Sequence, residues 1–125
     1  MRLSKRSIDR LSTCNQKLIA LFATAIEETP IDFTVLEGFR DADRQNYLYD
    51  NGKSLARFPQ SKHNHYPSRA CEVAPVPIDW ENIDRFILLS EHIKNIAMKL
   101  NIDIVWGGDW KNFRDYPHYE LKPKE

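Results

Sequence analysis

The sequence has no excess of charge of either sign. Lys and Arg together number 18, and Asp and Glu together also number 18, so the formal net charge at pH 7 is zero. Because domains that bind nucleic acid usually present a strongly basic face, this balance gives no reason to expect a nucleic-acid partner. No apolar run approaches the roughly 20 residues of a membrane-spanning helix, so we expect no membrane insertion.

Cysteine is also scarce, and the two present, Cys14 and Cys71, lie far apart in the sequence. Two cysteines are too few for a disulfide framework, and in a reducing compartment both would remain thiols. The basic start of the chain is followed by no apolar segment or small-residue cleavage site, so no secretory signal peptide is predicted. With no repeat, linker or low-complexity segment, the chain is expected to form one globular domain, residues 1–125.

The patterns that are present mix helices and strands. They predict an α+β fold, in which a small antiparallel sheet of about three or four strands has helices packed on one side. Apolar residues at helical spacing predict helices over 13–29 and 42–51, and from Asp79 or Asn82 to residue 100. Alternating apolar residues predict strands over 31–36, 70–76, 102–106 and 116–121, and a short charged tail, 122–125, follows.

Several details of the helices follow from side-chain chemistry. Thr13 and Gln16 form a candidate capping box for the first helix, and Asp41 can cap the second. In the second helix, Leu48 and Tyr49 are predicted core residues. The apolar stripe predicted for the third helix consists of Ile83, Phe86, Ile87, Ile93, Ala97 and Leu100.

Two separate segments contain the residue types that bind metal ions. Zinc accepts imidazole nitrogen and carboxylate oxygen as ligands, and a catalytic zinc keeps one position open. His63, Glu72 and His118 form such a set of three, and Asp115, close to His118 in sequence, can act as a general base. In a small domain, histidines are more often surface or satisfied core residues, so spacing alone leaves both interpretations open.

Other candidate residues near these segments have more than one interpretation. His65 is an alternative ligand to His63 and otherwise a loop residue lining a groove. Cys71 is predicted to be a buried small residue, because it points to the strand face opposite the expected ligand. Trp106 and Trp110 either form the floor of a cleft or belong to the core.

Seven short motifs occur in a particular order between residues 31 and 121. They are Gly38-Phe39-Arg40, Gln45, Leu48-Tyr49, Ser61-Lys62-His63, Ala70-Cys71-Glu72, Trp106-Gly107-Gly108-Asp109-Trp110 and Asp115-Tyr116-Pro117-His118. Together they resemble the zinc D,D-carboxypeptidase and L-alanyl-D-glutamate endopeptidase family, which cuts bacterial cell-wall peptides, and especially its small phage-endolysin branch. The resemblance implies a hedgehog/D,D-peptidase-like α+β fold.

The resemblance also implies roles for individual residues. His63, Glu72 and His118 would hold Zn²⁺, and Asp115 would be the general base. Arg40 would stabilise the oxyanion of the tetrahedral intermediate, because its guanidinium is always charged and offers several donors.

The family further implies a substrate and a place of action. Ser61 would hydrogen-bond the substrate or groups beside the site, and is otherwise part of a plain loop turn. Gln45 would bind the substrate or orient loop groups near the site, and is otherwise a solvated polar residue. The partner would be the peptide of peptidoglycan, and the protein is expected to be a monomer. It would be made in the host cytoplasm and reach the cell wall after release, with the help of a separate membrane-permeabilising protein.

Two positions depart from the family pattern. The metal-binding acid is usually Asp, whereas this chain has Glu72, whose extra methylene moves the carboxylate by roughly one bond length. The loop between His63 and Ala70 has Pro67 and Ser68 where a Gly is more common, and it is slightly longer. Two alternatives therefore accompany the endopeptidase prediction: a D-Ala carboxypeptidase of the same family, and a non-catalytic relative that binds the cell wall or a protein partner.

Overall fold

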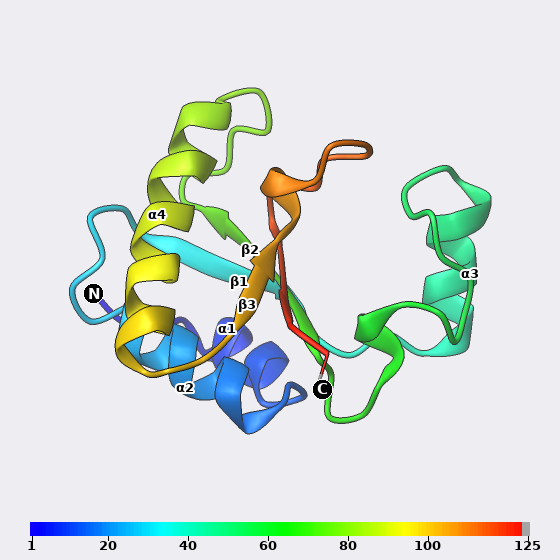
Figure 1. Cartoon of the computed structure of the whole chain (residues 1–125), viewed down its shortest axis with the longest axis horizontal. Helices are drawn as coiled ribbons and strands as arrows, with labels where there is room; N and C mark the ends of the chain where they lie inside the picture. The colour runs from blue at the N-terminus through cyan, green and yellow to red at the C-terminus, as the bar shows by residue number, and fades with distance from the viewer. Residues whose placement is uncertain (124–125) are drawn as a thin grey trace.

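Residues 1–123, which this computed structural model describes, form four α-helices, two short 3-10 helices and a four-stranded antiparallel sheet (Figure 1). The α-helices are α1 (Lys5–Leu11), α2 (Gln16–Ala25), α3 (Ala42–Asp50) and α4 (Ile83–Lys99), and the 3-10 helices are η1 (Lys62–Asn64) and η2 (Gly107–Asp109). The strands are β1 (Phe33–Glu37), β2 (Ala70–Pro75), β3 (Ile104–Trp106) and β4 (His118–Leu121), in the sheet order β1-β2-β4-β3. The predicted α+β fold is confirmed.

The two faces of the sheet have different environments. Helices α1, α2 and α4 lie on one side, whereas α3 and the loop after it lie on the other (Figure 1). Cys71 pairs with Tyr119 in the β2–β4 register, and both side chains are buried in the core beneath the helices. Because side chains alternate along a strand, the next pair, Glu72 and His118, faces the opposite side. The predicted one-sided packing therefore holds for three helices and not for α3.

The first helices differ from the prediction. Helix α1 was not predicted; Ser4 caps it by accepting a hydrogen bond from the Ser7 amide. The predicted capping box is wrong, since Asn15 caps α2 and accepts a hydrogen bond from the Lys17 amide. Thr13 instead donates to the carbonyl of Arg10 and accepts from the amide of Phe39. Its hydroxyl thus joins the end of α1 to the segment after β1.

Helix α4 presents a slightly different face from the one predicted. Its buried residues are Phe86, Leu89, Ser90, Ile93 and Ala97, at intervals of three and four residues. The predicted Ile83, Ile87 and Leu100 lie at the margin and are between 38% and 39% exposed. Asn82 occupies the N-cap position without a side-chain bond, while Asp79 accepts from the Glu81 amide.

Helix α3 begins as predicted, because Asp41 caps it by accepting from the Arg44 amide. Leu48 is buried as expected, but Tyr49 is 39% exposed and lies beneath the guanidinium of Arg57. The prediction of a core role for Tyr49 is therefore wrong.

Strands β1, β3 and β4 each begin two residues later than predicted, whereas β2 begins at Ala70 as predicted and ends one residue earlier. The segment before β4 is a turn, in which the amide of Asp115 donates to Gly107 and the amide of His118 donates to Asp115. Within residues 1–123, no helix has the length and apolar character needed to cross a membrane. The last two residues of the predicted charged tail, 124–125, lie outside the described residues.

Candidate metal centre

Three donor atoms from distant parts of the chain meet on the open face of the sheet. His63 comes from η1, Glu72 from β2 and His118 from β4, and their candidate ligand atoms all lie within 4.8 Å of one another. Glu72 Oε2 is 3.0 Å from His118 Nδ1 and 3.5 Å from His63 Nε2. The structure thus brings together the three residues that the sequence analysis selected.

The backbone of η1 sets the position of His63. Ser61 and Asn64 form a capping box, in which the Ser61 hydroxyl accepts from the His63 amide and the Asn64 side chain accepts from the Ser61 amide. The His63 Nδ1–H donates to the carbonyl of Gly38 at 2.7 Å. Because a carbonyl can only accept, this bond leaves the Nε2 lone pair of His63 facing the centre.

Gly38 lies where no larger residue fits. A Cβ at this position would overlap the Thr13 hydroxyl, the Arg10 carbonyl and the Cys14 sulfur. The absence of a side chain lets the segment after β1 approach the end of α1 closely. This approach fixes the carbonyl that orients His63.

His118 is oriented from the other side by a carboxylate. Its Nε2–H donates to Glu120 Oε1 at 2.7 Å, and Glu120 Oε2 in turn lies 3.2 Å from Lys62 Nζ. No role was predicted for Glu120, although its position two residues after His118 on a strand places it on the same face. Such carboxylate–histidine pairs set the tautomer of a metal ligand and increase its basicity.

The geometry of the two rings fits a bound cation. His63 Nε2 and His118 Nδ1 are 3.3 Å apart, while the opposite nitrogen of each ring donates away from the centre. Two neutral imidazoles would therefore point lone pairs at each other, an arrangement that needs a proton or a cation between them. Two imidazole nitrogens with one carboxylate oxygen match the ligand sets of catalytic zinc sites.

The charges of the three side chains follow from their surroundings. Burial alone would raise the pKa of Glu72, but the hydrogen bond from His118 and the nearby imidazole of His63 hold it far below its usual range. Burial lowers the pKa of His63, and nearby Arg40 adds to this effect. Burial also disfavours the charged form of His118, yet the Glu120 and Glu72 carboxylates raise its pKa to about 9. A metal ion would displace the proton of His118.

Asp115 lies next to this set. Its Oδ2 is 3.8 Å from His118 Nδ1, and burial together with the negative charge of Glu72 raises its pKa to about 6. Gly107 makes the approach possible, because a Cβ there would overlap the Asp115 carbonyl. A carboxylate with a pKa near neutrality can accept a proton and release it again.

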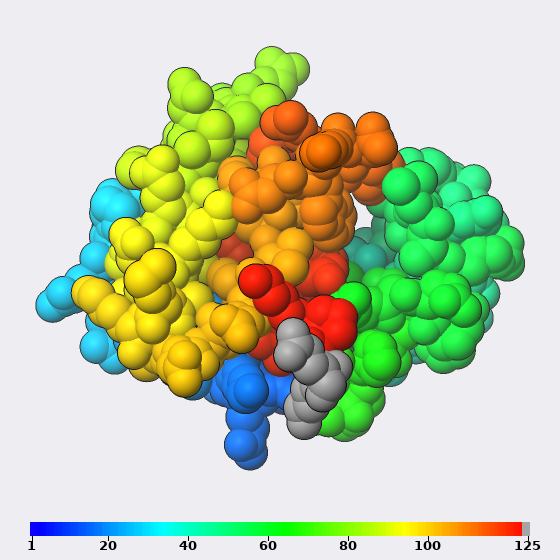
Figure 2. Space-filling view, in the orientation of Figure 1, coloured from blue at the N-terminus to red at the C-terminus, as the bar shows by residue number. Residues whose placement is uncertain are grey.

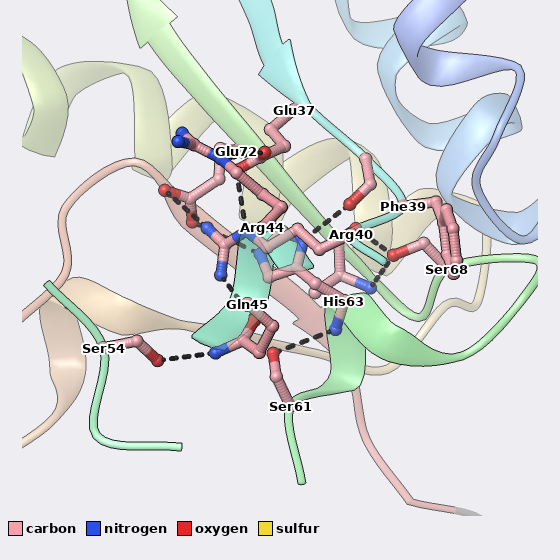
Figure 3. A network of polar contacts seen from close by, with 12 residues as sticks. Glu37, Phe39, Arg40, Arg44, Gln45, Ser54, Ser61, His63, Ser68 and Glu72 are labelled. Atoms are coloured by element: carbon pink, nitrogen blue, oxygen red, sulfur yellow. Dashed lines mark hydrogen bonds and ion pairs between the residues drawn. The ribbon is translucent and has the colours of Figure 1, made fainter. Parts of the chain in front are cut away.

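Arg40 and Gln45 form a connected network beside the centre (Figure 3). The Arg40 Nε donates to Glu37 Oε1 at 2.7 Å, and its Nη2 lies 3.8 Å from Glu72 Oε1. Gln45 is fully buried; it accepts from Arg40 Nη1 and donates to Ser54 and to the carbonyl of Ala56. Gln45 therefore orients Arg40 and the loop after α3, the second of the two roles expected for it.

The centre lies in the wall of a cavity of about 740 Å³. In Figure 2 the surface is hollowed between the orange-red segment that precedes β4 and the green region of α3 and the loop after it. Trp110 lines this cavity, with its ring 5.0 Å from that of His118. Trp106 is buried in the core. Of the two predicted alternatives, Trp110 therefore fits the cleft and Trp106 fits the core.

Two further expectations can be compared with the structure. His65 is exposed and does not belong to the cavity lining, so the prediction that it lines the groove is wrong. Cys71 is fully buried in the core, as predicted, and Cys14 is also buried there.

The fold and the site define a class: an α+β protein with two histidines and a carboxylate arranged for a single metal ion beside an open cavity. A family model described as phage L-alanyl-D-glutamate peptidase matches residues 1–123. The chain belongs to this family, which confirms the resemblance recognised in its motifs.

Named relatives agree with this assignment. The chain is 30% identical over 124 residues to the L-alanyl-D-glutamate peptidase of Escherichia phage T5, covering 97% of this chain and 89% of the relative. It is 31% identical over 106 residues to the peptidoglycan L-alanyl-D-glutamate endopeptidase CwlK of Bacillus subtilis (strain 168), covering 74% of this chain and 62% of CwlK. The crystal structure of the L-Ala D-Glu endopeptidase ChiX of Serratia marcescens superposes with a TM-score of 0.85 at 27% identity, covering 98% of this chain and 90% of ChiX.

Proposed function

We propose that this protein is a zinc-dependent peptidase of the phage-endolysin type, which hydrolyses the L-alanyl-D-glutamate bond of peptidoglycan stem peptides. The observation that carries the proposal is the convergence of His63, Glu72 and His118 in the wall of an open cavity, with Asp115 beside them. Family membership and the printed names of the relatives support the choice of bond.

His63, Glu72 and His118 would hold the zinc ion. When bound, zinc polarises the scissile carbonyl and lowers the pKa of a water molecule. Asp115 takes the proton of the attacking water and passes it to the leaving amine, a role that its raised pKa suits. The two histidine ligands keep their orientation because Gly38 and Glu120 hold the outer nitrogens of their imidazoles.

Arg40 stabilises the negative oxygen that develops during the reaction. Glu37 and Gln45 hold its guanidinium through Nε and Nη1, and its Nη2 remains beside Glu72 at the centre. A permanently charged donor that is already oriented needs little rearrangement in the transition state.

The length of Glu72 is compatible with this proposal. The longer side chain comes from a strand position paired directly with His118, and its Oε2 reaches both histidine nitrogens. The substitution of Glu for the usual Asp therefore leaves a compact set of donor atoms.

The proposal extends to the setting of the reaction. Residues 1–125 would act as a single monomeric domain, made in the host cytoplasm and reaching the cell wall only after release. The phage T5 relative supports this setting.

Mass spectrometry of purified peptidoglycan after incubation with the zinc-loaded protein tests the proposal. Fragments that begin with D-glutamate are expected. Release of D-Ala alone would indicate a carboxypeptidase, and no release despite bound zinc would indicate a wall-binding relative. Asp115→Ala should reduce cleavage by at least about 100-fold while the fold and the bound zinc persist; rates near wild type would remove Asp115 from the mechanism.

A further inference from the structure

The guanidinium of Arg44 is held in place through its Nε, while its two terminal nitrogens face the cavity without a side-chain partner among the described residues. It lies in the first turn of α3 and lines the cavity. Its Nε donates to Glu37 Oε2 at 3.1 Å, and its side chain is 50% exposed. Among the described residues, Glu37 is the one side-chain partner of Arg44, so both terminal nitrogens are available to a ligand.

Glu37 also connects Arg44 to the metal centre. One oxygen of its carboxylate accepts from Arg40 and the other accepts from Arg44, so that the two guanidinium groups flank it (Figure 3). Arg40 in turn lies 3.8 Å from Glu72. Arg44 is therefore held at a defined position, connected to the candidate metal ligand Glu72 through three successive ion pairs.

The other cations of the cavity are less suited to bind an anion. Within residues 1–123, the cavity lining contains four Lys and Arg side chains: Arg40, Arg44, Lys53 and Lys62. Arg40 is engaged by Glu37 and Gln45, and Lys62 is paired with Glu120. Lys53 is exposed and has no side-chain partner among the described residues that would orient it.

The proposed substrate carries an anion close to the bond that is cut. A D-glutamyl residue has two carboxyl groups, and the onward peptide bond uses only one of them. The other remains as a free carboxylate next to the scissile nitrogen. We propose that Arg44 binds this free carboxylate and so selects a D-glutamyl residue on the leaving side; the inference rests on the proposed function. A guanidinium suits the task, because two parallel N–H groups match the two oxygens of a carboxylate.

Two synthetic peptides test the inference: L-alanyl-γ-D-glutamyl-L-lysine with its α-carboxylate free, and the same peptide with this group as a carboxamide. The wild-type protein should cleave the free acid with a kcat/KM about 10- to 100-fold higher than the amide, as expected for a charge-assisted hydrogen bond. Arg44→Gln should reduce this preference to less than about 3-fold, mainly by lowering kcat/KM for the acid. Arg44→Lys should restore part of it.

Two further variants serve as matched controls. Arg57→Gln removes an exposed arginine outside the cavity lining, and it should keep the wild-type preference. If Lys53→Gln loses the preference and Arg44→Gln keeps it, the assignment to Arg44 is overturned. Equal cleavage of both peptides by the wild type would also overturn it, while leaving the peptidase function intact. Cleavage of neither peptide by the zinc-loaded wild type would instead overturn the proposed function.

Discussion

His63 Nε2 and His118 Nδ1 face each other at 3.3 Å, although the two residues are 55 positions apart in the sequence. Each ring is turned inward by a bond on its far side, to the Gly38 carbonyl or to Glu120. The fold therefore places both nitrogens within reach of a single cation.

The first prediction concerns the length of the acidic ligand. Glu72→Asp should weaken zinc binding by about 10-fold or more, because the carboxylate would recede by roughly 1.5 Å toward β2. Both histidine nitrogens, now 3.0 and 3.5 Å from Glu72 Oε2, would then be farther from it. Isothermal titration with zinc measures the change, and Glu91→Asp on the exposed face of α4 serves as control. Tighter binding by Glu72→Asp would show that the backbone spacing suits the shorter acid.

The second prediction concerns pH and the metal-free protein. The pKa of His118 is raised from its ordinary value of 6.5 to about 9 in the folded state, so the fold retains a proton that the unfolded chain loses. This stabilisation is fully present below pH 6.5 and is lost as the pH rises through 9. The free energy of unfolding should fall by up to about 3 kcal/mol over this range.

Urea denaturation of chelator-treated protein between pH 6.5 and 9.5 measures this effect. In His118→Gln the decline should be much smaller, because the titrating group is gone. An equally steep decline in the variant would assign the pH dependence to other residues.

The third prediction concerns the close approach at Gly38. Gly38→Ala should destabilise the fold by about 1–3 kcal/mol, because its Cβ would overlap Thr13 and Arg10. The displaced carbonyl would also release the His63 ring, so zinc affinity should fall by about 10-fold. Denaturation and zinc titration measure the two effects separately.

Gly52→Ala is the matched control for this variant. Gly52 has a φ of 72° and open space around its Cα, so alanine there should cost about 1 kcal/mol of stability through backbone strain. Its zinc affinity should remain at the wild-type value. A Gly38→Ala protein with unchanged zinc affinity would show that the carbonyl does not orient His63.

The fourth prediction concerns the carboxylate behind His118. Glu120→Ala should reduce zinc affinity by about 10- to 100-fold, because the His118 Nε2–H loses its acceptor and the ring loses its fixed tautomer. Lys62 would also lose its partner. Glu91→Ala, which removes an exposed carboxylate from α4, should leave zinc affinity unchanged. Equal affinities in the two variants would show that Glu120 has no supporting role.

Much of this architecture could be predicted from local patterns. Alternation predicted that Glu72 and Cys71 lie on opposite faces of β2, because side-chain direction in a strand follows from backbone geometry alone. The cap at Asp41 was equally local, since it depends on one side chain and a nearby amide.

Other features depended on contacts between distant segments. Thr is a residue type that often caps helices. The hydroxyl of Thr13 instead joins the end of α1 to the amide of Phe39, a contact that local sequence cannot specify. Tyr49 has the spacing of a core residue, yet it is 39% exposed and lies beneath the guanidinium of Arg57. The roles of Gly38 and Glu120 also became visible only in three dimensions.

The sequence by itself determined which side chains can bind a metal ion, which face of each strand they occupy and which family they resemble. Only the tertiary structure decided that η1, β2 and β4 bring three of them within 4.8 Å, which neighbours orient each ring, and where Arg44 is held. The reason is physical: side-chain direction is a local property of the backbone, whereas distances between remote atoms depend on how the whole chain packs.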